Sequence, residues 1–152
     1  MDFELVLKNR RSVRSFSNFA PPERDVEKIM AAARMAPSAG NLKARQIIVM
    51  KKGSKSRALA EASGGQEFVA DAPFVLVFCA DLKKIEPYGE RGRDLYCIQD
   101  AAASVENALL MAVNIGLAGC WVGAFDEERV REICGLPDYL RPVALIPIGY
   151  EK

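Results

Sequence analysis

The apolar run from Phe74 to Phe78 constrains the fold of this chain more than any other segment. Successive side chains of a strand point to opposite faces of a sheet, so a strand with no polar face must be covered on both sides. We therefore expect a central strand between two layers of helices. Further strands are expected at 46–50, 120–123 and 143–148.

Apolar residues at helical spacing predict the covering layers. The helices are expected at 2–9, 21–36, 54–62, 66–70, 95–115 and 126–134, with 83–93 as an exposed polar connection. In the first helix, Phe3, Val6 and Leu7 should face inward. Few strands, separated by helices, indicate a three-layer sandwich of the α/β or α+β class. The length of 152 residues suits a single domain over 1–152.

The charge balance argues against two classes of partner. With 21 Lys and Arg against 20 Asp and Glu, the chain has no overall basic field for nucleic acid or an anionic membrane. The first residues are acidic, no signal-peptide core follows, and the apolar run 74–80 is too short to span a bilayer. We expect a cytoplasmic protein without a membrane partner.

The absence of histidine limits the chemistry. It excludes a Ser-His-Asp triad, a Cys-His pair and any histidine-ligated metal. The four cysteines are far apart in sequence and are expected to be reduced core thiols, not metal ligands or a redox pair. An enzyme of this composition must use carboxylates, Lys or Tyr, or leave the chemistry to a cofactor.

The basic segment at residues 10–14 is the first candidate for binding. If it is extended, Arg10, Ser12 and Arg14 project to one side, and Arg11 projects to the other. Guanidinium groups match phosphate oxygens, and a serine hydroxyl adds a donor, so the pattern fits an anion site. The alternative is a solvated basic turn.

Three further segments have residues suited to a flat ligand. They are the loop with Pro37, Ser38, Ala39 and Asn41, the turn with Gln66, and the strand end with Val122, Gly123 and Ala124. Small residues let backbone approach a ring, and amide side chains both donate and accept hydrogen bonds. Each segment can equally be an ordinary turn.

Taken in order, these segments resemble the FMN-dependent nitroreductase family. The resemblance rests on 10–16, 36–42, 68–73, 99–103, 119–126 and 148–150, and it extends over nearly the whole chain. It implies an α+β sandwich with a mostly antiparallel sheet, and a homodimer with FMN at the subunit interface. NADH or NADPH would be the reductant.

The resemblance also implies roles for individual residues. Arg10, Ser12 and Arg14 would bind the FMN phosphate, with Arg11 beside them. The loop of Pro37, Ser38, Ala39 and Asn41 would reach the isoalloxazine from the partner subunit. Backbone at Val122, Gly123 and Ala124 would face the ring near N5, and Gln66 would reach its pyrimidine edge.

The implied reaction is a ping-pong transfer of hydride from NAD(P)H through flavin N5 to a nitroaromatic, a quinone or a similar small acceptor. No side chain need act as acid or base, because the flavin carries the chemistry. The chain departs from the family pattern in two places: Lys43-Ala44 stands where Gln-Pro is common, and no basic tail follows Tyr150. These departures leave open a non-enzymatic FMN-binding or redox-sensing module.

Overall fold

The computed structural model describes residues 2–152. Its centre is a four-stranded sheet in the order β1-β2-β4-β3, and all of its strand pairs are antiparallel. The strands are β1 (Arg45–Lys51), β2 (Phe74–Asp81), β3 (Ala118–Gly119) and β4 (Leu140–Gly149). Every residue of β2 is buried, as the run at 74–78 predicts for a central strand.

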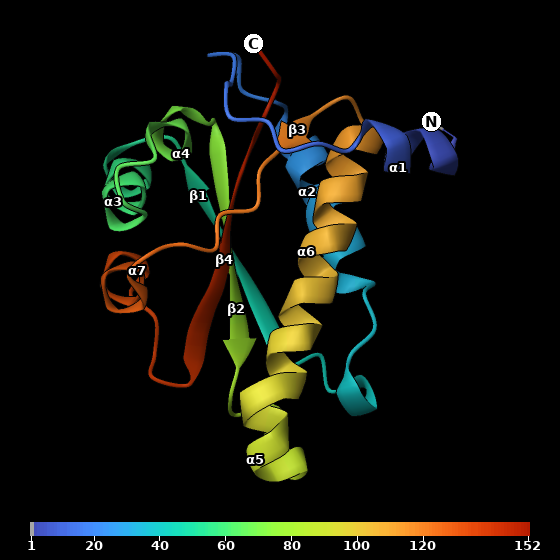
Figure 1. The fold of residues 1–152 in the computed structure, drawn as a ribbon, viewed down its shortest axis with the longest axis vertical. Coiled ribbons are helices and arrows are strands. Elements are labelled where there is room, and N and C mark those ends of the chain that lie inside the picture. The colour runs from blue at the N-terminus through green and yellow to red at the C-terminus, as the bar shows by residue number, and fades with distance from the viewer. Residues whose placement is uncertain (1) are drawn as a thin grey trace.

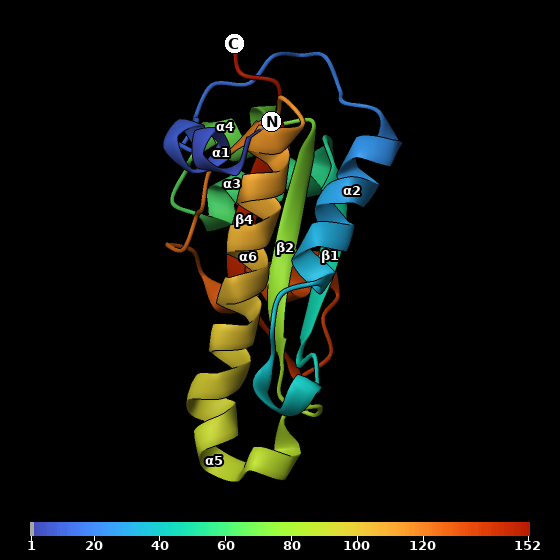
Figure 2. The same cartoon turned by 90° about the vertical axis from the view of Figure 1, so that its right-hand side faces the viewer.

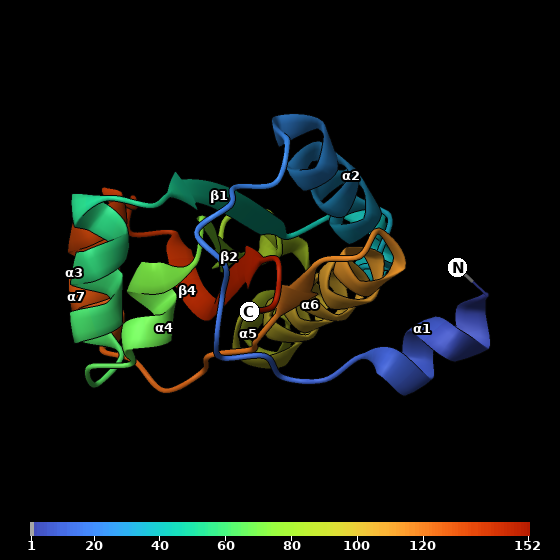
Figure 3. The ribbon, with the colours of Figure 1, turned by 90° about the horizontal axis from the view of Figure 1, so that it is seen from above.

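Helices cover both faces of the sheet (Figures 1 and 3). One layer holds α2 (Glu23–Arg34) and α6 (Cys97–Asn114), with α1 (Phe3–Asn9) beside α6. The other holds α3 (Ser54–Ala62), α4 (Glu67–Asp71) and α7 (Glu127–Cys134). Short helical turns occur at η1 (Ala39–Asn41), η2 (Glu86–Tyr88), α5 (Gly89–Arg91) and η3 (Gly92–Tyr96). The α+β three-layer sandwich with an antiparallel sheet is confirmed.

Two apolar cores follow from this layering. Phe74, Leu76 and Phe78 point from β2 toward α2 and α6, where they join Ile29 and Val105. The alternate residues of β2, Val75 and Val77, pack under α3, α4 and α7 with Leu59, Val69 and Val130. A strand that is apolar on both faces therefore joins the two cores.

Local signals fix the start of α1 and both ends of α7. Asp2 accepts a hydrogen bond from the N–H of Glu4, and Asp126 accepts one from Arg129 at 3.1 Å, so each is an N-cap. Gly135 ends α7 in the left-handed region with φ of 62°. No helix within residues 2–152 is long and apolar enough to cross a membrane.

Three sequence predictions are wrong. The strand at 120–123 is a loop with a single bridge from Val122 to Leu145, because Pro147 of β4 lies opposite Cys120 and has no N–H to continue the pairing. In α1 only Val6 is buried, since the helix lies at the margin of the α2–α6 layer. The connection at 83–93 is partly helical and buries Ile85.

Candidate active site

The basic segment is extended along the edge of the sheet. Ser12 forms a parallel bridge with Gly119, and the N–H of Val13 donates to the Gly119 carbonyl at 3.1 Å. Phe16 pairs with Glu151 near the end of the chain. Because Val13 is buried, its neighbours Ser12 and Arg14 face solvent, as the predicted alternation requires.

The side chains of this segment differ in their partners. Arg11 forms an ion pair with Glu151. The Arg14 guanidinium lies 5.9 Å from the ring centre of Phe68, a cation–π contact. Within residues 2–152, the side chains of Arg10 and Ser12 have no hydrogen-bond or ion-pair partner. Arg10, Ser12 and Arg14 are therefore the donors left for an external anion.

Helix α4 joins this segment to the loop at 122–124. The Gln66 amide precedes α4 and donates to the carbonyls of Ser63 at 2.8 Å and Ala124 at 3.5 Å. Phe68, two residues further along the chain, lies under Arg14. The structure thus brings Arg14, Gln66 and Ala124 to one side of the molecule.

The loop at 122–124 presents free backbone donors. Val122 is held by two hydrogen bonds with Leu145, of 2.9 and 3.0 Å. Gly123 and Ala124 are exposed, and their N–H groups have no acceptor within residues 2–152. A Cβ on Gly123 would meet no heavy atom closer than 3.9 Å, so the approach to this backbone is open.

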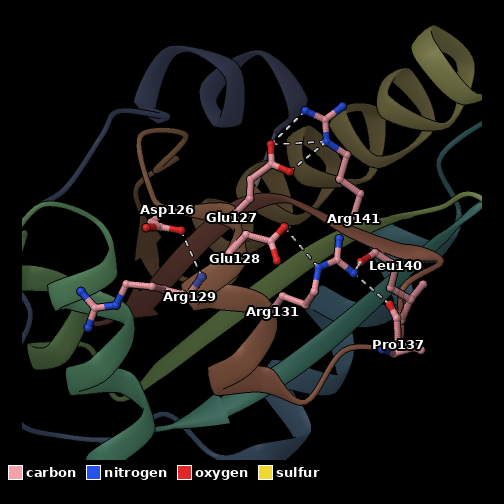
Figure 4. A network of polar contacts seen from close by, with 8 residues as sticks. All are labelled: Asp126, Glu127, Glu128, Arg129, Arg131, Pro137, Leu140 and Arg141. Atoms are coloured by element: carbon pink, nitrogen blue, oxygen red, sulfur yellow. Dashed lines mark hydrogen bonds and ion pairs between the residues drawn. The ribbon is translucent and has the colours of Figure 1, made fainter.

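A small cavity of about 210 Å³ opens beside Gly123. Its wall includes Arg141, which donates to both carboxylate oxygens of Glu127 at 2.9–3.3 Å (Figure 4). The hydrogen bond to Glu127 raises the pKa of the Arg141 guanidinium. Arg131 donates to the carbonyls of Pro137 and Leu140 and ties the end of α7 to the start of β4. These contacts hold the segment that follows Gly123 in place.

The second predicted loop is held by two polar side chains, the buried carboxylate of Asp100 and the half-buried hydroxyl of Ser38. The N–H of Ala39 donates to Asp100 of α6 at 2.9 Å, and the N–H of Lys43 donates to the Ser38 hydroxyl at 2.9 Å. The Asn41 side chain is exposed, and its amide has no partner within residues 2–152. Its φ of 56° lies in the left-handed region, which asparagine tolerates.

Arg45 is the second anchor of this loop. Its guanidinium is buried and donates to the carbonyls of Arg34 and Ala36 at 3.0 and 2.8 Å, just where α2 ends. Burial lowers the pKa of Arg45, and the charge of Asp100 opposes that shift. The two charges therefore fix the loop between α2 and α6.

The two halves of the predicted site do not meet within one chain. In Figures 1 and 2 the blue segment after α1 lies at the end of the molecule that holds the C-terminus. The cyan segment around η1 lies in the opposite half. Arg10–Arg14, Gln66 and 122–124 form one half, and Pro37–Asn41 forms the other.

Sequence reasoning missed three residues that shape the site: Phe68, Arg45 and Asp100. Asp100 had a signal, because helical spacing places it with Ser104 on the apolar stripe of α6. The sequence signal for Arg45 was weaker: it is a charged residue at the start of a mostly apolar strand. Nothing in the sequence indicates that Phe68 lies under Arg14, since their contact depends on the packing of α4.

The donor set has a definite chemical character. Two guanidinium groups and a hydroxyl are free at one end, backbone N–H groups and an amide lie beside them, and a further amide is free on a second loop. This set fits a ligand with a phosphate and a flat polar ring, and among residues 2–152 no cluster of acids and thiols is arranged to hold a metal. The class defined by the fold and site is an α+β protein for a phosphorylated aromatic cofactor.

The chain belongs to the nitroreductase family, whose model matches residues 7–69 and 61–150. Nitroreductases depend on FMN and take NAD(P)H as reductant, so the chain is an oxidoreductase enzyme whose cofactor is FMN. The alternative of a non-enzymatic FMN-binding or redox-sensing module is therefore wrong.

Individual relatives agree with this assignment. A NADH dehydrogenase from Thermus thermophilus is 34% identical over 99% of this chain and 87% of its own length. An oxygen-insensitive NADPH nitroreductase from Salmonella typhimurium is 32% identical over 95% of this chain, which spans 64% of that protein. A nitroreductase family protein from Clostridium novyi NT superposes with a TM-score of 0.90 at 32% identity, covering 100% of this chain and 86% of its own.

Proposed function

We propose that two copies of this chain bind FMN between them and transfer hydride from NAD(P)H to a nitroaromatic, a quinone or a similar small acceptor by a ping-pong mechanism. The observation that carries this proposal is the separation of the two half-sites. Neither half surrounds a flat cofactor by itself, and a second copy would supply the missing wall.

The phosphate half consists of Arg10, Ser12 and Arg14. Among the described residues, the side chains of Arg10 and Ser12 have no partner and Arg14 has only the ring of Phe68, so each can donate to phosphate oxygens. Arg11 adds positive charge nearby but is paired with Glu151, so its contribution is smaller. This ranking agrees with the alternation expected from the sequence, in which Arg11 projects to the opposite side from Arg10, Ser12 and Arg14.

The ring half combines two segments. The free N–H groups of Gly123 and Ala124 would face the reactive edge of the ring, near N5. Gln66, which already lies against Ala124, would reach the pyrimidine edge. From the partner, Pro37, Ser38 and Ala39 would pack on the ring, and Asn41 would donate or accept at its rim.

An exposed apolar surface supports the dimer. Phe3 is 65% exposed and Met35 is 82% exposed, both on the outer side of the α1, α2 and α6 layer. Between them lies a groove of about 360 Å³ with a mostly apolar wall. Large exposed apolar residues that share one surface favour a protein interface. We infer that this surface contacts the second copy.

When bound, FMN supplies the two-electron chemistry that no side chain of this chain provides. The residues of the chain bind the phosphate, orient the ring and limit the access of water. Backbone N–H groups aimed at the reactive edge stabilise negative charge there without rearranging. This division of work agrees with a chain that contains no histidine.

The test is anaerobic spectroscopy of the FMN-loaded protein. NADPH or NADH should bleach the flavin absorbance, and a quinone or nitroaromatic added after removal of nicotinamide should restore it. Steady-state plots at several acceptor concentrations should give parallel lines, as expected for ping-pong exchange. Converging lines, or bound flavin that neither nicotinamide reduces, would contradict the proposal.

A further inference from the structure

A basic pocket of about 350 Å³ lies beside the loop at 37–43. It is formed by the end of α2, the start of β1 and the turn that follows β2. Its lining residues are Arg34, Lys43, Arg45, Gln46, Ile47 and Lys84. Four of these six are cationic and none is acidic. In a chain with a net charge of +1, this is a strong local concentration of positive charge.

Three of the four cations are free. Arg45 is buried and is occupied by carbonyl groups and by the charge of Asp100. Arg34, Lys43 and Lys84 are exposed, and within residues 2–152 their side chains have no hydrogen-bond or ion-pair partner. Such unpaired charges around one hollow favour an anion.

The carboxylate of Asp81 does not neutralise these cations. It is buried, with 2% exposure, and it is not part of the pocket lining. One of its oxygens accepts the backbone N–H groups of Lys83 and Lys84 at 3.1 and 2.9 Å, and the other accepts the Gln46 amide at 3.5 Å. These contacts fix the backbone of Lys84 in the pocket wall, and within the described part of the chain its ammonium group has no partner.

Lys43 is held in an unusual backbone conformation. Its φ of 51° is in the left-handed region, which is uncommon for lysine. The hydrogen bond from its N–H to Ser38 maintains that conformation. The same turn carries Asn41, so the pocket lies directly beside the loop that is proposed to contact the ring.

We propose that Arg34, Lys43 and Lys84 bind the phosphoryl groups of the nicotinamide dinucleotide reductant. This inference rests on the proposed function, because it assumes that nicotinamide reaches the ring beside the loop at 37–43. The dinucleotide carries its phosphates on the part of the molecule that extends away from the nicotinamide. Ammonium and guanidinium groups at the pocket bind phosphate oxygens through charge-assisted hydrogen bonds.

The binding test uses FMN-saturated protein, so that the phosphate site at Arg10–Arg14 is already filled. Inorganic pyrophosphate is titrated by calorimetry into wild type, Lys43→Gln and Lys84→Gln, with Lys55→Gln, at an exposed position of α3, as the matched control. Loss of one charge-assisted contact should weaken pyrophosphate binding about tenfold in the two pocket variants. The control should stay within about twofold of wild type. Equal affinity for pyrophosphate in all four proteins would contradict the proposed anion site.

Steady-state kinetics identify which phosphate is bound. A rise in KM for NADPH alone assigns the pocket to the 2′-phosphate, and a rise for both NADPH and NADH assigns it to the diphosphate. Either result supports the inference. Weaker pyrophosphate binding with unchanged KM for both reductants would overturn the assignment to the dinucleotide. Failure of the proposed function is distinguishable, because then neither nicotinamide reduces wild type, whereas the pyrophosphate titration still reports on the pocket.

Discussion

The carboxylate of Asp100, in the first turn of α6, accepts the backbone N–H of Ala39 at 2.9 Å. This contact joins a helix of the core to the loop that is proposed to lie on the flavin of a second copy. Asp100 is only 5% exposed, and its second oxygen has no partner within residues 2–152. A buried carboxylate is costly, so its position here depends on Ala39 and on the nearby charge of Arg45.

Replacing Asp100 with Ala should loosen this loop. The change removes the acceptor of Ala39 and leaves the buried Arg45 without its counter-charge, so we expect a loss of about 2–3 kcal/mol in the free energy of unfolding. Asp100→Asn keeps an acceptor and should lose less. Urea unfolding measures both, and Glu106→Ala, exposed on the same helix, is the control. If Asp100→Ala lowers the free energy of unfolding no more than the control does, the contact between Asp100 and Ala39 does not stabilise the fold.

Gly40 should resist substitution because of Tyr88. Its φ is 55°, and a Cβ at this position would lie 2.4 Å from the Tyr88 hydroxyl oxygen. Gly64 has a similar φ of 73° with open space around it, so Gly64→Ala reports the backbone strain alone, about 1 kcal/mol.

The Tyr88 contact is measured by a double-mutant cycle. Gly40→Ala should destabilise more than Gly64→Ala in wild type, and the excess should disappear when Tyr88 is also changed to Ala. If the two glycine variants unfold at the same urea concentration in both backgrounds, Tyr88 does not restrict the loop.

The sequence predicts the fold well because its signals are local and strong. The run at 74–78 has no polar face, Ser54–Ala62 has helical spacing, and Asp126 is an N-cap residue at the right place. The strand expected at 120–123 fails because of its neighbour in β4: Cys120 lies opposite Pro147, which has no N–H to donate, and only the single bridge from Val122 to Leu145 follows. Strand register of this kind depends on tertiary contacts, which a local pattern does not contain.

The site is less predictable than the fold. The alternation of buried Val13 with exposed Ser12 and Arg14 follows from an extended segment and could be read from the sequence. The pairing of Arg11 with Glu151 could not, because it joins residues 140 positions apart. The roles of Arg45 and Asp100 also depend on packing, since each holds a loop that begins on another element.

Arg14→Ala should weaken FMN binding about tenfold or more, since it removes a charge-assisted hydrogen bond to the phosphate. Arg11→Ala should have a smaller effect, because Arg11 is already paired with Glu151. Quenching of flavin fluorescence during titration gives both dissociation constants. An affinity in Arg14→Ala equal to that of wild type would refute the phosphate role of Arg14.

Cys79 should make stability sensitive to high pH. Burial raises the pKa of its thiol from 9.0 to about 12, so the folded protein holds this proton more tightly than the unfolded chain. The stabilising contribution is complete below pH 9 and is lost as pH rises from 9 to about 12, by up to about 1.4 kcal/mol per pH unit.

Urea unfolding at about pH 8 and about pH 10.5 tests this pH dependence. Cys79→Ala should lose less stability than wild type over that interval. An equal loss in both proteins would assign the effect to other groups.

The most direct test of the shared site is a mixed dimer. Arg14→Ala damages the phosphate half, and Asn41→Ala damages the half on the opposite part of the chain. A dimer with one copy of each variant has one site with both defects and one site with neither. Co-expressed and purified through two different tags, it should bind one FMN per dimer with wild-type affinity, although both parent proteins bind weakly. Mixed dimers that bind FMN no better than either parent would contradict a site shared between two copies.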